Sequence, residues 1–88
     1  MNDVLILVPI HDDWESARLL LGRLGRQEGL DGARVVFVDD GSTRAAPAGW
    51  PGVDPGRIAR VEVLELRRNL GHQRALAVGL AYVAARVP

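Results

Sequence analysis

Three short apolar runs constrain the fold of this chain more than any other feature of its sequence. They are VLILVPI at residues 4–10, RVVFV at 34–38 and VEVLEL at 61–66. The first two are almost continuously apolar, which is typical of strands covered on both faces in a parallel sheet. We therefore predict a strand in each run, with pairing that weakens near Pro9 because proline has no N–H to donate.

Segments with helical periodicity follow the first and third runs. In the first segment the residues that recur on one helical face are Trp14, Ala17, Leu21 and Leu24. Asp12 or Asp13 is predicted to cap the start of this helix, and Asp12 with Glu15 has the spacing of a capping box. Residues 72–86 predict a second helix, whose apolar face is formed by Ala75, Leu76, Gly79, Leu80 and Val83.

The segment between the second and third runs reads differently. Residues 41–57 contain three prolines and four glycines, which predicts a loop with at most one helical turn. The predicted order is therefore strand, helix, strand, loop, strand, helix. This alternation favours an α/β fold with parallel strands and right-handed crossovers, and 88 residues allow one small domain.

The composition excludes several classes of function. The chain has 11 basic and 11 acidic residues and no net charge, which argues against a nucleic-acid partner. It contains no cysteine, so thiol nucleophiles, disulfides and thiolate metal sites are excluded. No segment has the 18 or more apolar residues of a membrane span, and the start does not resemble a signal peptide. We expect a cytoplasmic location and no membrane contact from this segment.

The second run ends in two adjacent carboxylates, within VVFVDDGST at residues 35–43. In open parallel sheets, ligands bind beyond the C-terminal ends of the strands. The residues expected along that edge are His11, Asp12, Asp13, Asp39, Asp40, Gly41 and Ser42. We expect the paired carboxylates to be open at this edge, where they can bond a base or ribose or help to hold a cation. The alternative is turn chemistry, which Asp, Gly, Ser and Thr all favour.

Three blocks of sequence, in order, carry a family resemblance. VLILVPIHDDWESARLLLGRL, VVFVDDGST and LRRNLGHQRALAVGL together resemble the opening of family 2 glycosyltransferases, nearest the polyprenyl-phosphate sugar transferases such as the dolichol-phosphate mannose synthases. The resemblance implies the Rossmann-like half of a GT-A domain over residues 1–88, truncated before its fourth strand. It also implies a nucleotide-diphosphate sugar as the binding partner of a longer parent protein.

The resemblance further implies which residues bind the nucleotide. They are Pro9, Ile10, His11, Asp39, Asp40, Gly41, Ser42 and Arg74. Asp40 is then the carboxylate that faces the base, and Asp39 shapes the turn. Arg74 bridges to phosphate, although a solvated helix face is the other interpretation for this arginine. His72 is interpreted as a residue of the helix start and not as a catalyst.

The sequence also departs from the family pattern. His11 and Asp12 replace an aromatic residue and an asparagine, Ala77 stands where many members have asparagine, and the loop at 45–56 replaces a helix. No D-x-D metal motif and no catalytic base is identifiable in the 88 residues. We therefore assign no catalytic and no metal residues, and we expect the chain alone to be inactive. A divalent cation, Mg²⁺ or Mn²⁺, is expected in the parent, which is expected at the inner face of a membrane.

Two other functions compete with this interpretation. A response-regulator receiver would use Asp12 and Asp13, but it also needs a lysine near its phosphoryl site, and the chain has none. A non-catalytic α/β interaction module would keep the fold without the chemistry. The resemblance places the first strand in the centre of a larger sheet, so its edge in this chain is expected to mediate self-association.

Overall fold

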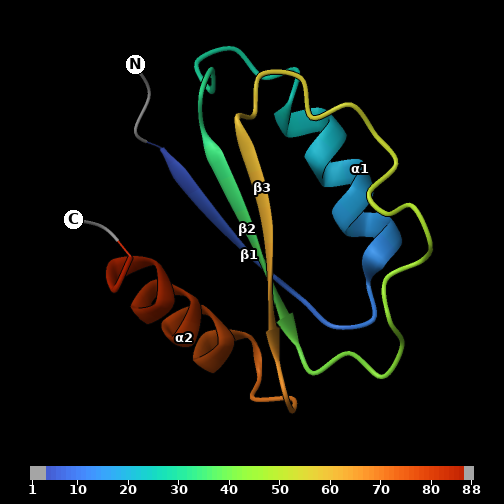
Figure 1. The fold of residues 1–88 in the computed structure, drawn as a ribbon, viewed down its shortest axis with the longest axis vertical. Helices are drawn as coiled ribbons and strands as arrows, with labels where there is room; N and C mark the ends of the chain where they lie inside the picture. Colours follow the sequence, from blue (N-terminus) through green and yellow to red (C-terminus); the bar gives the residue numbers. More distant parts are fainter. Residues whose placement is uncertain (1–3, 87–88) are drawn as a thin grey trace.

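The computed structural model describes residues 4–86 as a three-stranded parallel sheet with two helices (Figure 1). The elements are β1 (Leu5–Ile10), α1 (Trp14–Leu24), β2 (Arg34–Asp40), β3 (Arg60–Leu66) and α2 (His72–Ala84). The strand order is β1-β2-β3, and both pairings are parallel. No helix forms between β2 and β3, where turns and bends dominate. The predicted α/β order and the predicted loop are confirmed.

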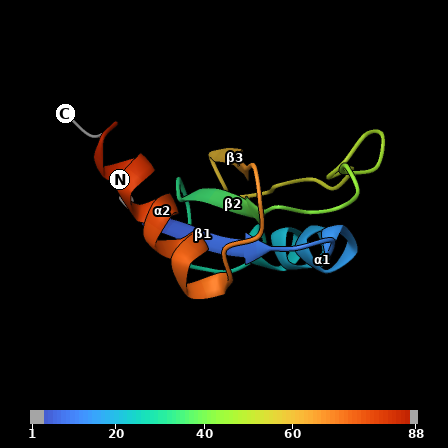
Figure 2. The same ribbon diagram turned by 90° about the horizontal axis from the view of Figure 1, so that it is seen from below.

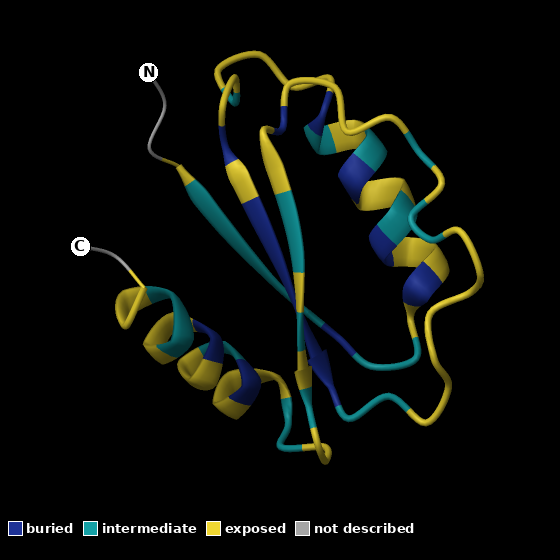
Figure 3. Ribbon diagram, viewed as in Figure 1, coloured by how far each residue is buried: buried dark blue, intermediate teal, exposed yellow. Residues whose placement is uncertain are grey.

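The two helices cover opposite faces of the sheet (Figure 1). α1 packs on β1, and α2 lies over β1 and β2. β2 is the central strand and the most buried, whereas β3 alternates between exposed and half-buried residues (Figure 3). Side chains of a strand alternate between the two faces, so β2 contributes Val35 and Phe37 to one core and Val36 and Val38 to the other.

The core on the α1 face is built around aromatic rings. The indole of Trp50 lies edge-on to Trp14 at 5.2 Å and to Phe37 at 5.4 Å between ring centroids. Trp50 Nε1–H donates to the carbonyl of Trp14 at 2.8 Å, and Trp14 Nε1–H donates to the carbonyl of Arg44 at 3.0 Å. These contacts anchor the segment after β2 beside α1, so the predicted Pro- and Gly-rich loop covers this face in place of the helix of the family pattern.

The core on the α2 face is smaller and depends on close approach. A Cβ atom on Gly79 would lie 2.8 Å from Val38 Cγ2 and 3.6 Å from Leu7 Cδ2, so only glycine lets α2 sit this near the sheet. Ala75 is fully buried beside it. The prediction that Leu80 belongs to the buried face is wrong, because this side chain is 59% exposed. Leu80 lies 100° around the helix from Gly79 and therefore points along the flank of α2.

The start of α1 differs from the prediction. Asp13 is the N-cap residue, but no side chain caps the helix, and the proposed capping box does not form. Glu15 pairs instead with Arg18. Asp12 has a φ of 57°, an unusual value for a residue with a side chain, and its carboxylate bonds to the loop after β2.

Candidate functional site

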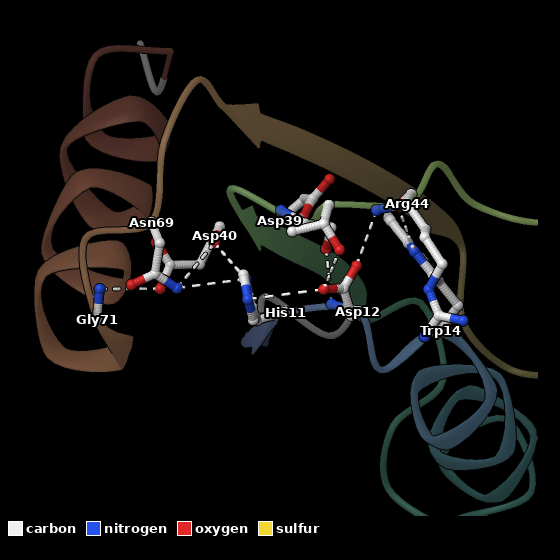
Figure 4. Close-up of polar contacts among 10 residues, drawn as sticks. His11, Asp12, Trp14, Asp39, Asp40, Arg44, Asn69 and Gly71 are labelled. Carbon is white, nitrogen blue, oxygen red and sulfur yellow. Dashed lines mark hydrogen bonds and ion pairs between the residues drawn. The ribbon is translucent and has the colours of Figure 1, made fainter.

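The C-terminal ends of β1 and β2 meet the segment before α2 in one hydrogen-bonded cluster, which we call the polar edge (Figure 4). Its members come from three parts of the chain, the β1–α1 turn, the end of β2 with its loop, and the turn at 69–71. They are His11, Asp12, Asp39, Asp40, Ser42, Thr43, Arg44, Asn69, Leu70 and Gly71. The predicted convergence at this edge of the sheet is therefore present.

Both carboxylates of the DD pair are buried, contrary to expectation. Asp39 is 8% exposed and Asp40 is 0% exposed, because β2 continues through both residues and does not end before them. Adjacent strand residues point to opposite faces, so Asp39 turns toward α1 and Asp40 toward α2. A buried carboxylate is tolerated only where hydrogen bonds replace water, and each of the two finds different donors.

Asp40 holds the connection between β3 and α2. Its Oδ1 accepts the Leu70 N–H at 2.6 Å, and its Oδ2 accepts the Gly71 N–H at 2.9 Å. Gly71 is the N-cap of α2, so the negative charge also lies at the positive end of the helix dipole. The sequence did not predict this contact. Recognition of a base by Asp40 stays a prediction. Each carboxylate oxygen has a second lone pair that could accept a hydrogen bond from the base.

Asp39 shapes the turn after β2, as predicted. Its Oδ1 accepts the Ser42 N–H at 3.0 Å, and its carbonyl accepts the Gly41 N–H at 3.0 Å. Gly41 has a φ of 65°, and a Cβ atom there would overlap backbone atoms of Arg68 and Asn69. Glycine at position 41 is therefore required both by its backbone conformation and by the close approach of the segment before α2.

Asp12 links the β1–α1 turn to the loop after β2. Its Oδ1 accepts the Arg44 N–H at 2.9 Å, its Oδ2 accepts the Thr43 hydroxyl at 2.7 Å, and its own N–H donates to Ser42 Oγ at 2.8 Å. The hydroxyl of Thr43, followed by the N–H of Arg44, holds the pKa of the Asp12 carboxyl below its ordinary value. The spacing of residues in the sequence does not predict these contacts, since the partners are about 30 residues apart.

His11 and Asn69 close the other half of the polar edge. His11 Nδ1 lies 2.8 Å from the Asp40 carbonyl and 3.2 Å from Asn69 Nδ2. Because a carbonyl can only accept, a hydrogen bond to Asp40 requires the tautomer that carries its proton on Nδ1. Asn69 Nδ2 donates to the same carbonyl at 3.2 Å. His11 Nε2 lies 3.7 Å from Asp12 Oδ2. Asn69 lies within the third sequence block, but the sequence does not predict that its side chain belongs to the site.

The remaining predicted residues lie around this cluster. Pro9 is half-buried within β1, and the Ile10 side chain is buried in the α1-face core, so Ile10 offers only its backbone to a ligand. Arg74 and His72 are exposed in the first turn of α2. Residues 4–86 contain no group of three or more His, Cys, Asp or Glu residues placed to hold a metal ion. An open pocket of about 600 Å³ lies elsewhere, lined by Leu21, residues 51–55 and residues 58–61.

A parallel α/β domain with polar side chains gathered at the C-terminal ends of its strands belongs to a class that binds ligands at that edge. The family model for glycosyl transferase family 2 matches residues 5–87. The chain therefore belongs to this family. Comparisons with curated proteins and with solved structures give no significant match. None of the helices formed by residues 4–86 is long and apolar enough to cross a membrane.

Proposed function

We propose that this chain is the nucleotide-recognition half of a glycosyltransferase and that the polar edge binds the nucleotide of a nucleotide-diphosphate sugar. Hydrogen bonds around Asp40 and Asp12 join the end of β1, the end of β2 and the turn before α2. This arrangement, in a member of glycosyl transferase family 2, is the observation that supports the proposal. The same bonds fix the loops in one arrangement before a ligand arrives, which lowers the entropic cost of binding.

The predicted binding residues keep their roles in this proposal. The backbone at Pro9, Ile10 and His11 lines the nucleoside, and Gly41 with Ser42 forms the adjoining turn. Asp40 recognises the base through its remaining lone pairs, which requires the turn at Leu70 and Gly71 to give access to this buried carboxylate. Arg74, exposed at the start of α2, neutralises phosphate charge.

The chain alone is proposed to lack transferase activity. Transfer from a nucleotide sugar needs the charge of the leaving diphosphate neutralised, and the 88 residues contain no D-x-D motif with which to hold Mg²⁺ or Mn²⁺. The described residues therefore do not fit the cation, and no step of the reaction is assigned to it. Incubation of the purified chain with UDP- and GDP-sugars should release no nucleotide above the rate in buffer. Release that depends on enzyme concentration would contradict this proposal.

The finer identity of the protein is also a proposal. The likeness of the third sequence block to the polyprenyl-phosphate sugar transferases supports a lipid-phosphate acceptor. Such an acceptor is consistent with a cytoplasmic parent protein at the inner face of a membrane.

Calorimetric titration with UDP and GDP, with and without Mn²⁺, tests nucleotide binding by the chain. We expect weak binding that is independent of Mn²⁺. Arg74→Gln should weaken it about three- to tenfold through the loss of a charge-assisted contact. Arg86→Gln is the matched control, because Arg86 lies just beyond the other end of the same helix, where it donates to Tyr82. Absence of heat with every nucleotide would support the alternative function, a non-catalytic interaction module.

A further inference from the structure

The turn between β1 and α1 has an unusual backbone conformation at Asp12. Its φ of 57° lies in the left-handed region, where a side chain crowds the backbone and where Asp and Asn are tolerated better than most residues. A conformation of this kind persists only where the surrounding structure holds it. At Asp12 three hydrogen bonds to the loop after β2 do so.

These three bonds, which join Asp12 to Ser42, Thr43 and Arg44, are called the clasp below. The Asp12 N–H donates to Ser42 Oγ, and the carboxylate accepts from the Thr43 hydroxyl and the Arg44 N–H. Figure 2 shows the segment that leaves β1 and the segment that leaves β2 running side by side beyond the sheet. The clasp ties these two segments together. The Arg44 carbonyl is held as well, by Trp14 Nε1–H at the start of α1.

The clasp also lies beside the ring of His11. Nε2 of this ring is 3.7 Å from Asp12 Oδ2, and Nδ1 is 2.8 Å from the Asp40 carbonyl. The ring therefore bridges the clasp and the end of β2. Because residues 11 and 12 are adjacent, the left-handed turn at Asp12 sets where its carboxylate stands relative to the His11 ring.

We propose that Asp12 is a positioning residue for nucleotide binding, an inference that rests on the proposed function. Asp12 acts through its neighbours and not through contact with the ligand. Its backbone conformation and its carboxylate fix residues 9–11 relative to the turn at Gly41 and Ser42, the two segments that line the nucleoside in the proposed function. Without the clasp these segments adopt the binding arrangement for only part of the time, and the apparent affinity falls by that fraction.

Substitutions at position 12 separate the backbone conformation from the carboxylate. Asparagine adopts the left-handed conformation, its Oδ1 can accept the Arg44 N–H, and its amide can donate to the Thr43 hydroxyl oxygen. Glycine keeps the conformation but loses the side-chain bonds, whereas alanine keeps neither. Asp12→Asn should therefore bind nucleotide no more than about twofold more weakly than the natural chain. Asp12→Gly should bind about three- to tenfold more weakly, and Asp12→Ala at least about tenfold more weakly.

Calorimetric titration of these variants with UDP and with GDP tests the proposal, at a temperature where circular dichroism shows each protein to be folded. Val36→Ala is the control for a general loss of stability, because Val36 is buried in the α2-face core and lies outside the polar edge. It should lower Tm and leave the affinity unchanged. If Asp12→Ala does not fold, the comparison of Asp12→Gly with Asp12→Asn is still decisive.

The possible results of the titration separate this inference from the proposed function. Equal affinities of the natural chain and Asp12→Gly would overturn the inference and leave the proposed function standing. A loss in Asp12→Asn as large as in Asp12→Gly, or an equal loss in Val36→Ala, would overturn the inference in the same way. If the natural chain bound neither nucleotide, the proposed function would be wrong and the inference with it.

Amide hydrogen exchange of the chain without nucleotide tests the clasp independently of binding. The Arg44 amide should exchange about tenfold faster in Asp12→Gly and Asp12→Ala, because both lack its acceptor. In Asp12→Asn it should exchange as slowly as in the natural chain. Equal exchange at Arg44 in all of these proteins would show that the carboxylate does not hold the loop, and would overturn the inference whether or not the natural chain binds nucleotide.

Discussion

The two faces of the sheet have cores of different size and composition, although the same strands supply both. On the α1 face, Trp14, Phe37 and Trp50 form a continuous aromatic core. On the α2 face the buried core consists of Val36, Val38 and Ala75, closed by Gly79. The smaller core is compensated at its end, where Asp40 bonds the turn before α2. Both faces therefore combine packing with hydrogen bonds, but the larger, aromatic core lies on the α1 face.

The DD pair follows the same division. Asp39 lies on the α1 face and bonds within its own turn, whereas Asp40 lies on the α2 face and bonds a segment 30 residues away. The two carboxylates are neighbours in the sequence but stabilise different parts of the molecule. Substitutions on each face therefore test the comparison directly.

The largest expected effect is that of removing the aromatic core of the α1 face. Phe37→Ala should lower the free energy of unfolding by about 3–5 kcal/mol, because it leaves a cavity beneath Trp50. Val38→Ala, one residue along and on the other face, should cost about 2 kcal/mol, since fewer methyl groups are lost. Urea denaturation followed by circular dichroism measures both. Equal costs would contradict the proposed difference between the faces.

The second prediction separates the two carboxylates. Asp40→Asn places an amide NH₂ against a backbone N–H of Leu70 or Gly71, so one buried donor loses its acceptor. The expected cost is about 2–3 kcal/mol in the free energy of unfolding. Asp39→Asn should cost less than about 1 kcal/mol, because asparagine can still accept the Ser42 N–H and favours turns.

The same pair of variants has a readout at the start of α2. Only Asp40→Asn should accelerate amide exchange at Leu70 and Gly71, since these two N–H groups bond to its carboxylate. If Asp39→Asn accelerated exchange at Leu70 and Gly71 to the same extent, the two carboxylates would not stabilise separate parts of the molecule, and the proposed difference between the faces would be wrong.

Most of the fold could be predicted from the sequence because burial on both faces leaves a clear pattern. VLILVPI and RVVFV permit no alternation, and three prolines with four glycines at 41–57 exclude a long helix. Leu80 was wrongly predicted to lie on the buried face, because apolar periodicity does not say how far around α2 the contact with the sheet extends. That limit is set by Gly79 and Val38, which meet only in three dimensions.

The polar edge was predictable as a location but not as a set of contacts. The topology rule for parallel sheets brings His11, Asp39 and Asp40 together without reference to their partners. Strand periodicity predicts that Asp39 and Asp40 point to opposite faces, provided that β2 is known to include both residues. The contacts of Asp12 and Asn69 depend on how two loops meet, which no local pattern encodes.

The third prediction tests how closely α2 approaches the sheet. Gly79→Ala gains about 1 kcal/mol of helix propensity but forces a Cβ atom to within 2.8 Å of Val38. Val38 is β-branched and buried, so the helix must move, and the net cost should be about 1–2 kcal/mol in unfolding free energy. In a Val38→Ala background the same substitution should cost less. An unchanged cost would show that Val38 does not limit the approach.

The smallest expected effect concerns the loop that covers the α1 face. The Thr43 hydroxyl, and then the Arg44 N–H, lower the pKa of Asp12 in the folded state. Its contribution to stability is therefore complete above the unfolded pKa of about 3.9 and is lost as the pH falls through the lower folded pKa. The difference in Tm between the natural chain and Asp12→Ala should stay constant from neutral pH to about pH 5 and narrow below about pH 4. Asp13→Asn, at the exposed neighbouring position, is the control and should leave Tm unchanged at neutral pH. A difference that persists unchanged in strong acid would show that the contribution of Asp12 to stability does not depend on its charge.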